Sequence, residues 1–102
     1  MDLESASGGI IKNATAEDVL ALSETQAYAI LSTGRDTYLQ FGRLGTTPPT
    51  YEMEYQEGSI DRHFRLADGP IPFDQVIQAF LWYLKGDSSW QKKLRWEPMR
   101  LR

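Results

Sequence analysis

The chain contains no cysteine and only one histidine among its 102 residues. Without thiols it cannot form disulfides, a thiolate nucleophile, a zinc–thiolate site or an iron–sulfur cluster. One histidine among scattered carboxylates has no dedicated ligand spacing, so we expect no metal and no other cofactor. No apolar run approaches the roughly 18 residues of a membrane span, and the first residues lack a signal-peptide layout. We therefore expect a cytoplasmic protein with no membrane partner.

The composition is that of a single globular domain. Hydrophobic residues make up 41% and charged residues 25%, and twelve residues are aromatic, which excludes a disordered chain. A chain of this length buries enough surface for one core. Residues 1–9 are rich in serine and glycine without apolar periodicity, so we predict a flexible N-terminal segment there and one domain over 10–102.

Charge is distributed unevenly along the chain. Residues 1–59 carry nine acidic and three basic side chains, whereas the remainder carries eight basic and five acidic ones. Such a dipolar surface suits a charged protein partner. The net charge of −3 argues against direct nucleic-acid binding, whose affinity comes from neutralising phosphates.

The hydrophobic pattern predicts two main helices. Thr15 followed by Asp18 is a variant capping box that starts a short helix over 15–23. The second helix follows Pro72, carries an apolar stripe at 3.6-residue spacing and ends at Gly86. One or two further turns are expected over 88–94.

Five segments are predicted to be strands because they are rich in β-branched and aromatic residues or alternate strictly between apolar and polar residues. They lie at 27–31, 37–41, 51–56, 60–66 and 95–97. Their order predicts an α+β domain in which the helices pack on an antiparallel sheet of four to five strands.

An acidic sheet face is the main candidate site. Alternation buries the apolar residues of 51–56 and 60–66 and places Glu52, Glu54, Asp61 and His63 on one outer face. A two-residue loop at Glu57-Gly58 would set Glu54 opposite Asp61, and like charges opposite one another are unfavourable. The face is either an ordinary solvated surface or a surface that awaits a basic protein.

Catalysis is the weaker interpretation of the same strand. Ser59, Asp61 and His63 alternate and share a face, which superficially matches a nucleophile with its base and orienting acid. Neighbours on one strand face are roughly 6.6–6.8 Å apart, and no oxyanion hole is evident. We expect no enzyme, and a small hydrolase or ligand-binding domain using Asp61 and His63 remains an alternative.

Trp82 lies off the apolar stripe of the second helix. It can pack against Trp90 or the C-terminal segment, or it can anchor an interface. If Trp82 anchors an interface, the chain belongs to a different class of function. It is then a small self-associating adaptor or regulatory protein that forms a homodimer through Trp82 or a sheet edge.

The C-terminal third of the chain carries a pattern of core positions that resembles a known family. The matching residues are Asp68-Gly69-Pro70, Pro72 to Phe80, Tyr83-Leu84, Gly86-Asp87 and Leu94 to Glu97. Over residues 60–97 the chain resembles the first-numbered family of immunity proteins from bacterial polymorphic-toxin systems. In that family an amphipathic helix with an Ala-Phe pair precedes a short linker and a tryptophan-containing strand. No residue role is transferred by this pattern.

The resemblance implies a non-enzymatic antitoxin that blocks a cognate bacterial toxin, often one acting on nucleic acid. Such toxins carry basic clefts, which an acidic face would complement. The residues expected to meet the toxin are Glu52, Glu54, Glu57, Asp61, His63 and Trp82.

Overall fold

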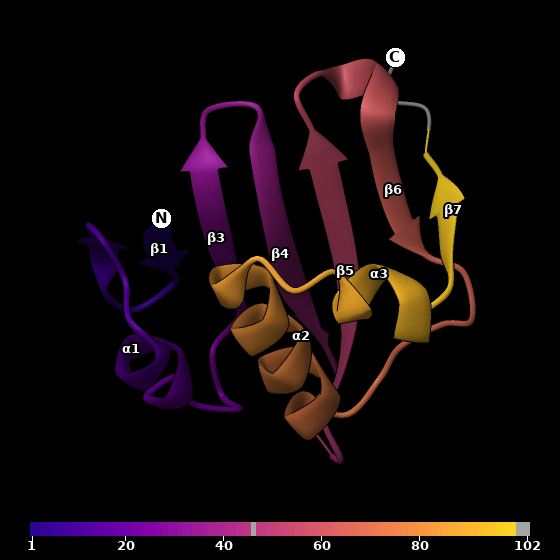
Figure 1. The fold of residues 1–102 in the computed structure, drawn as a ribbon. Helices are drawn as coiled ribbons and strands as arrows, with labels where there is room; N and C mark the ends of the chain where they lie inside the picture. Colours follow the sequence, from indigo (N-terminus) through magenta and orange to yellow (C-terminus); the bar gives the residue numbers. More distant parts are fainter. Residues whose placement is uncertain (46, 100–102) are drawn as a thin grey trace.

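The computed structural model describes residues 1–45 and 47–99, and these form one antiparallel sheet with three helices on one of its faces (Figure 1). The sheet has seven strands in the order β2-β1-β3-β4-β5-β6-β7. The α+β class and the antiparallel sheet are confirmed, while the predicted four to five strands and two main helices are too few. The strands are β1 (Asp2–Ser5), β2 (Gly9–Ile11), β3 (Tyr28–Gly34), β4 (Thr37–Leu44), β5 (Thr50–Glu57), β6 (His63–Leu66) and β7 (Trp96–Pro98).

Two additional strands lie near the N-terminus: β1 falls within residues 1–9, which the sequence indicated as flexible, and β2 lies where that segment meets the predicted domain. β1 pairs with β3 inside the sheet and β2 forms the edge. Leu3 is only 1% exposed and belongs to the core. The pattern missed β1 because it contributes one apolar side chain between polar neighbours, and so short a signal is indistinguishable from a loop.

The three helices lie where the sequence indicates, although the first ends at Leu20 and not at the predicted residue 23. α1 (Ala16–Leu20) starts at the capping box of Thr15 and Asp18. α2 (Phe73–Lys85) ends at Gly86, whose φ of 76° is the left-handed conformation in which glycine commonly closes a helix. α3 (Ser89–Lys93) follows after a short turn. In Figure 1 all three helices lie on the same side of the sheet.

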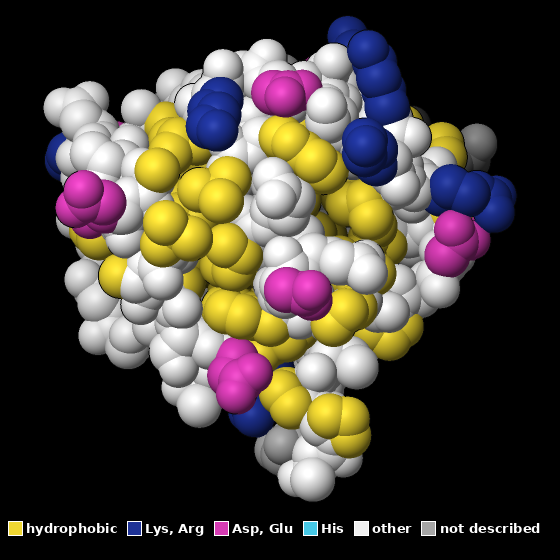
Figure 2. All heavy atoms as spheres, turned by 60° about the horizontal axis from the view of Figure 1, so that its bottom comes forward, with side chains coloured by type: hydrophobic (Ala, Val, Ile, Leu, Met, Phe, Trp, Pro, Cys, Tyr) yellow, Lys and Arg dark blue, Asp and Glu magenta, His cyan; other side chains and the backbone are white. Residues whose placement is uncertain are grey.

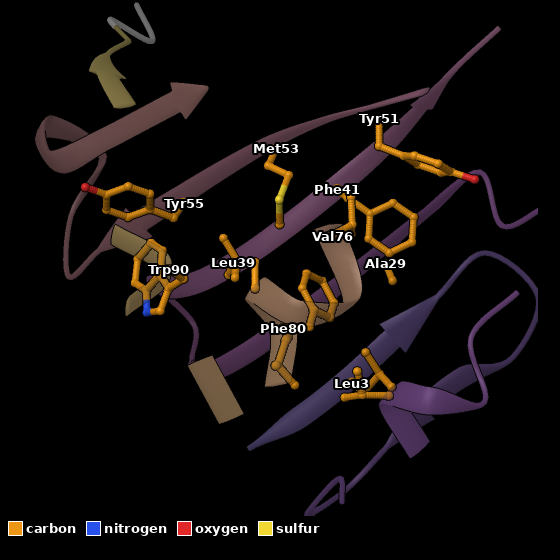
Figure 3. Packing of buried hydrophobic residues seen from close by; sticks show 13 residues of the cluster. Leu3, Ala29, Leu39, Phe41, Tyr51, Met53, Tyr55, Val76, Phe80 and Trp90 are labelled. Carbon is orange, nitrogen blue, oxygen red and sulfur yellow. The ribbon is translucent and has the colours of Figure 1, made fainter. Parts of the chain in front are cut away.

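The core fills the space between the sheet and α2. Leu39, Phe41 and Met53 point from the sheet towards Phe80 of α2 (Figure 3). A second group of aromatic rings surrounds Tyr55, which stacks on Phe64 at 4.8 Å and meets the rings of Trp90 and Trp96 edge-on. This apolar layer leaves the opposite face of the sheet without any covering helix.

The connection between β5 and β6 differs from the predicted two-residue loop. Gly58 turns with a φ of 82°, and residues 60–62 form the 3-10 helix η1 (Ile60–Arg62) before β6 begins at His63. Glu54 therefore pairs with Arg65, four residues beyond the predicted partner. The shift is an even number of residues, so His63 keeps its predicted face while Asp61 leaves the strand.

No helix in the described part of the chain has the length and apolar character needed to cross a bilayer.

Candidate protein-binding face

The side of the sheet turned away from the helices, here called the open face, is not covered by any helix of residues 1–45 and 47–99. Strand register places one row of side chains on it across all seven strands, because directly paired residues point to the same side. That row consists of Ile10, Glu4, Ile30, Gln40, Glu54, Arg65 and Glu97. Neighbouring rows add Asp2, Ser32, Tyr38, Gln56 and His63 on one side, and Tyr28, Gly42 and Glu52 on the other.

The open face is acidic. Its strands present five carboxylates there, those of Asp2, Glu4, Glu52, Glu54 and Glu97, against the guanidinium of Arg65. Two further basic groups lie at its margin: Arg35 lines a hollow together with Glu4, and Lys12 contacts Asp2. Three of the carboxylates are paired within the protein. Asp2 contacts Lys12 at 3.2 Å, Glu54 contacts His63 at 2.7 Å and Glu97 contacts Arg65 at 2.8 Å. Glu4 and Glu52 form no salt bridge within residues 1–45 and 47–99.

His63 lies beneath this face and is only 2% exposed. Its Nε2 is 2.7 Å from Glu54 Oε1, and its Nδ1 is 3.0 Å from Gln56 Oε1. The amide nitrogen of Gln56 donates to the carbonyl of Asp36 at 3.2 Å, which turns the amide oxygen towards the ring. Tyr38 completes the group with its hydroxyl 3.5 Å from Nδ1. His63 therefore holds two side chains of β5 in place and cannot itself contact a partner.

Charge and burial also act on Tyr38. Burial raises the pKa of the Tyr38 phenol above its ordinary value of 10.0, and the nearby carboxylates of Glu54 and Asp36 raise it further. The phenol stays neutral in the ordinary pH range and supplies a hydrogen-bonding hydroxyl beside the acidic residues. Tyr38 and Tyr28 both lie on the open face.

Three hollows shape the open face. One of about 390 Å³ lies over β1, β3 and β4 between Glu4 and Tyr38. One of about 380 Å³ lies where β5 and β6 diverge, beside Arg65. The third, about 210 Å³, lies at Gly42. Glu52 and Glu54 line the last two hollows together and therefore stand between them.

The six residues predicted to meet a partner do not form one surface. Glu52 and Glu54 lie on the open face. Glu57 points to the helix side, where its carboxylate accepts a hydrogen bond from Gln91 of α3 at 3.1 Å. Asp61 is exposed in η1, beyond the end of the paired strand.

Trp82 lies on the opposite side of the molecule. It is half-buried in a hollow of about 210 Å³ lined also by Gln75, Gln78, Lys93 and Leu94, and the Lys93 ammonium is 5.8 Å from its ring. Its neighbours there are residues of α2 and α3, so it shares no surface with Glu52 and Glu54. Tyr83, the next residue, packs instead against Trp90 with ring centroids 5.2 Å apart.

The helix side is a second uncovered surface. Figure 2, which looks obliquely at that side from the lower end, shows hydrophobic side chains gathered in the middle with charged ones around and between them. Only three residues of α2 are fully buried. Its partly exposed apolar residues are Phe73, Ile77, Leu81, Trp82, Tyr83 and Leu84.

The geometry around His63 does not assemble a hydrolytic triad. Both ring nitrogens face β5 side chains, whereas Ser59 caps η1 and Asp61 lies within η1. Within residues 1–45 and 47–99, no set of three or more His, Asp or Glu side chains is grouped to hold a metal ion.

Sequence reasoning missed two residues of the open face, Glu4 and Gly42. Glu4 lies in the strand that the pattern did not indicate. Gly42 carries a recognisable signal, since an isolated glycine inside a strand pattern indicates a bulge or a close approach.

Comparison with models of protein families, with curated proteins and with solved structures finds no match to this chain.

Proposed function

We propose that this chain is a non-enzymatic binding protein that blocks a bacterial toxin, and that its open face is the docking surface. One observation carries the proposal. The face of the sheet that no helix covers is also the face on which carboxylates outnumber basic groups. The resemblance of residues 60–97 to immunity proteins of polymorphic-toxin systems supplies the class of partner.

The carboxylates of Glu4 and Glu52 do not stabilise the fold through ion pairs within the described residues. Neither forms a salt bridge within the described residues, and both stand beside other acids on the face. The neighbouring acid lies two residues away on the same strand face, Asp2 for Glu4 and Glu54 for Glu52, at a spacing of roughly 6.6–6.8 Å along the strand. A cationic partner relieves the repulsion between these like charges, and the field of the face speeds its approach.

A toxin that acts on nucleic acid supplies the complementary surface. Its active site must bind phosphates, so the site carries lysine and arginine side chains in a cleft. An acidic, hollowed face of seven strands offers those cations carboxylates in place of phosphates. Covering the cleft stops the toxin without any chemistry by the antitoxin.

The test uses the toxin domain encoded beside this chain, purified as an inactive variant. The double variant Glu4→Gln/Glu52→Gln should slow association about three- to tenfold at low ionic strength and flatten its salt dependence, because steering charges act mainly on the association rate. A matched pair, Glu17→Gln/Asp61→Asn, removes two acids from outside the open face and should change the rate less than about twofold.

Two outcomes contradict the proposal in different ways. Equal effects of the two pairs would assign docking to a surface other than the open face. If the native chain neither binds the domain nor protects cells that produce its active form, the antitoxin function itself is wrong.

The apolar helix side supports a second candidate, a self-associating adaptor. Six hydrophobic residues of α2 pack against the core and keep part of their surface exposed, and a homodimer would bury that exposed part. Light scattering over a range of concentrations tests it. A dimer that Trp82→Ala converts to a monomer favours the adaptor, and a monomer throughout excludes it.

A further inference from the structure

The hollow at Gly42 results from one missing side chain in a row of three strands. Gly42 of β4 lies directly between Tyr28 of β3 and Glu52 of β5. With no side chain at its centre, this row leaves a space of about 210 Å³, several times the roughly 30 Å³ that one water molecule occupies. The lining residues are Tyr28, Gln40, Phe41, Gly42, Glu52 and Glu54.

The backbone does not require glycine at this position. Gly42 is not among the residues with positive φ. A Cβ atom placed on it would meet Glu52 at 3.5 and 3.7 Å, which is ordinary contact with a flexible side chain. Glycine inside a strand destabilises it relative to alanine. The fold would therefore accept a side chain here, and neither backbone conformation nor crowding explains the glycine.

The walls of the hollow match a flat cation. Glu52 and Glu54 come from the same strand on one side, and the ring of Tyr28 lies on the other. His63 occupies only Oε1 of Glu54, and Oε2 makes no hydrogen bond within the described residues. A guanidinium group can donate two parallel hydrogen bonds to carboxylates and stack on an aromatic ring, whereas an ammonium group cannot do both.

From this geometry we infer that the Gly42 hollow is a subsite for one arginine side chain of the partner. The inference rests on the proposed function, because it names the group by which a basic toxin would be anchored on the open face. Carboxylates of Glu52 and Glu54 bind the guanidinium edge, and Tyr28 covers its plane.

The experiment is an NMR titration of the isotope-labelled full chain with N-acetyl-arginine methylamide, a probe whose only charge is the guanidinium. The matched probes are the corresponding lysine derivative and the neutral citrulline derivative, which keeps the shape of arginine. We expect saturable shifts at Gly42 and its neighbours with the arginine probe, weaker ones with lysine and none with citrulline.

Filling the hollow should abolish this response. Gly42→Val should weaken binding of the arginine probe by at least about tenfold, the effect of losing a charge-assisted contact. Gly42→Ala fills less of the space, and the same titration is carried out on this variant if Gly42→Val does not fold. Gly34→Ala is the control, since Gly34 lies at the strand end with open space around it and should bind the probe as the native chain does.

The outcomes separate this subsite from the proposed function. Equal binding of the arginine probe by the native chain and by folded Gly42→Val, or equal shifts with citrulline, would overturn the subsite. If Gly42→Val also binds the toxin domain normally while Glu4→Gln/Glu52→Gln does not, the subsite is wrong and the function stands. A native chain that binds the probe at Gly42 but no toxin keeps the subsite and overturns the function.

Discussion

His63 Nε2 lies 2.7 Å from Glu54 Oε1, so one carboxylate of the acidic strand β5 is engaged by its own neighbour in the sheet. The predicted register set Asp61 opposite Glu54 and implied repulsion at this point. The observed register sets Arg65 opposite Glu54 and brings His63 beside it. The acidic excess of the open face therefore depends on Glu4 and Glu52 more than on Glu54.

Removing His63 should destabilise the protein. His63→Ala removes the ring that contacts Glu54 at 2.7 Å and the amide oxygen of Gln56 at 3.0 Å, and leaves that oxygen only the longer contact of 3.4 Å from the Tyr38 hydroxyl. Losing partners of buried polar groups costs about 1–3 kcal/mol. His63→Gln should recover part of the loss because its amide can donate to one of the two oxygens. Urea unfolding measures both variants. The control is Asp61→Asn, an exposed residue that should stay within about 0.5 kcal/mol of the native chain; an equal loss there would contradict the network.

Leu3 tests whether the N-terminal strand belongs to the core. Leu3→Ala removes a side chain that is 1% exposed, and such a change in a core costs about 2–5 kcal/mol. Ile10→Ala on the neighbouring edge strand β2 removes a side chain that is 59% exposed and should cost no more than about 0.5 kcal/mol. Denaturant unfolding compares the two. Equal, small losses would mean that residues 1–9 are a loose lead-in after all.

Alkaline pH should weaken the fold through its buried tyrosines. Burial, and secondarily the carboxylate of Glu57, raises the pKa of Tyr83 to about 12 from its ordinary value of 10.0. The folded state holds this proton more tightly than the unfolded chain, so the stability that it contributes is complete below pH 10.0 and is lost as the pH rises through about 12. Burial also raises the pKa values of Tyr38, Tyr51 and Tyr55.

The variant Tyr83→Phe isolates that contribution because it removes only the hydroxyl group. Its unfolding free energy should fall less steeply than that of the native chain between pH 10.0 and about 12. Unfolding is followed by circular dichroism and phenolate formation by absorbance. Identical pH profiles for the two proteins would show that Tyr83 does not contribute.

Replacement by alanine should change the stability of the fold in opposite directions at two glycines. Gly86 ends α2 with a φ of 76°, so Gly86→Ala forces a side chain into the left-handed region and should cost about 1–2 kcal/mol. Gly42 has an ordinary strand conformation with room for a Cβ, so Gly42→Ala should stabilise the fold by about 0.5–1 kcal/mol. Thermal unfolding measures the stability of both variants. A lower stability of Gly42→Ala than of the native chain would show that the fold itself requires glycine at this position.

Elements with strong periodicity were predictable, and elements defined by pairing were not. The apolar stripe of α2, the capping box at Thr15 and the alternation of β5 each carry a local signal that survives in the structure. β1 and β2 are short, and β1 contributes only Leu3 to the core, so their strand character comes from the partner to which they pair. The same reason explains the missed η1, since Ile60, Asp61 and Arg62 alternate like a strand but have no partner strand.

The candidate site was half predictable. Alternation places Glu52 and Glu54 on the outer face whatever the register, and the structure agrees. Asp61 was grouped with them by the predicted alternation of residues 60–66, Glu57 by its nearness in the chain and Trp82 by its aromatic character, and each lies elsewhere. Gly42 and Glu4 were not indicated as site residues because what each contributes depends on its neighbours across the sheet.

The amino-acid pattern alone determined the class of the fold, the positions of the helices and which side of β5 meets water, because these follow from hydrophobic spacing along one segment. Only tertiary structure decided what each acid faces: His63 for Glu54, Gln91 for Glu57 and open solvent for Glu52. Electrostatic partners are set by distances across strands and between layers, and those distances depend on register, on loop length and on which side of the sheet the helices cover.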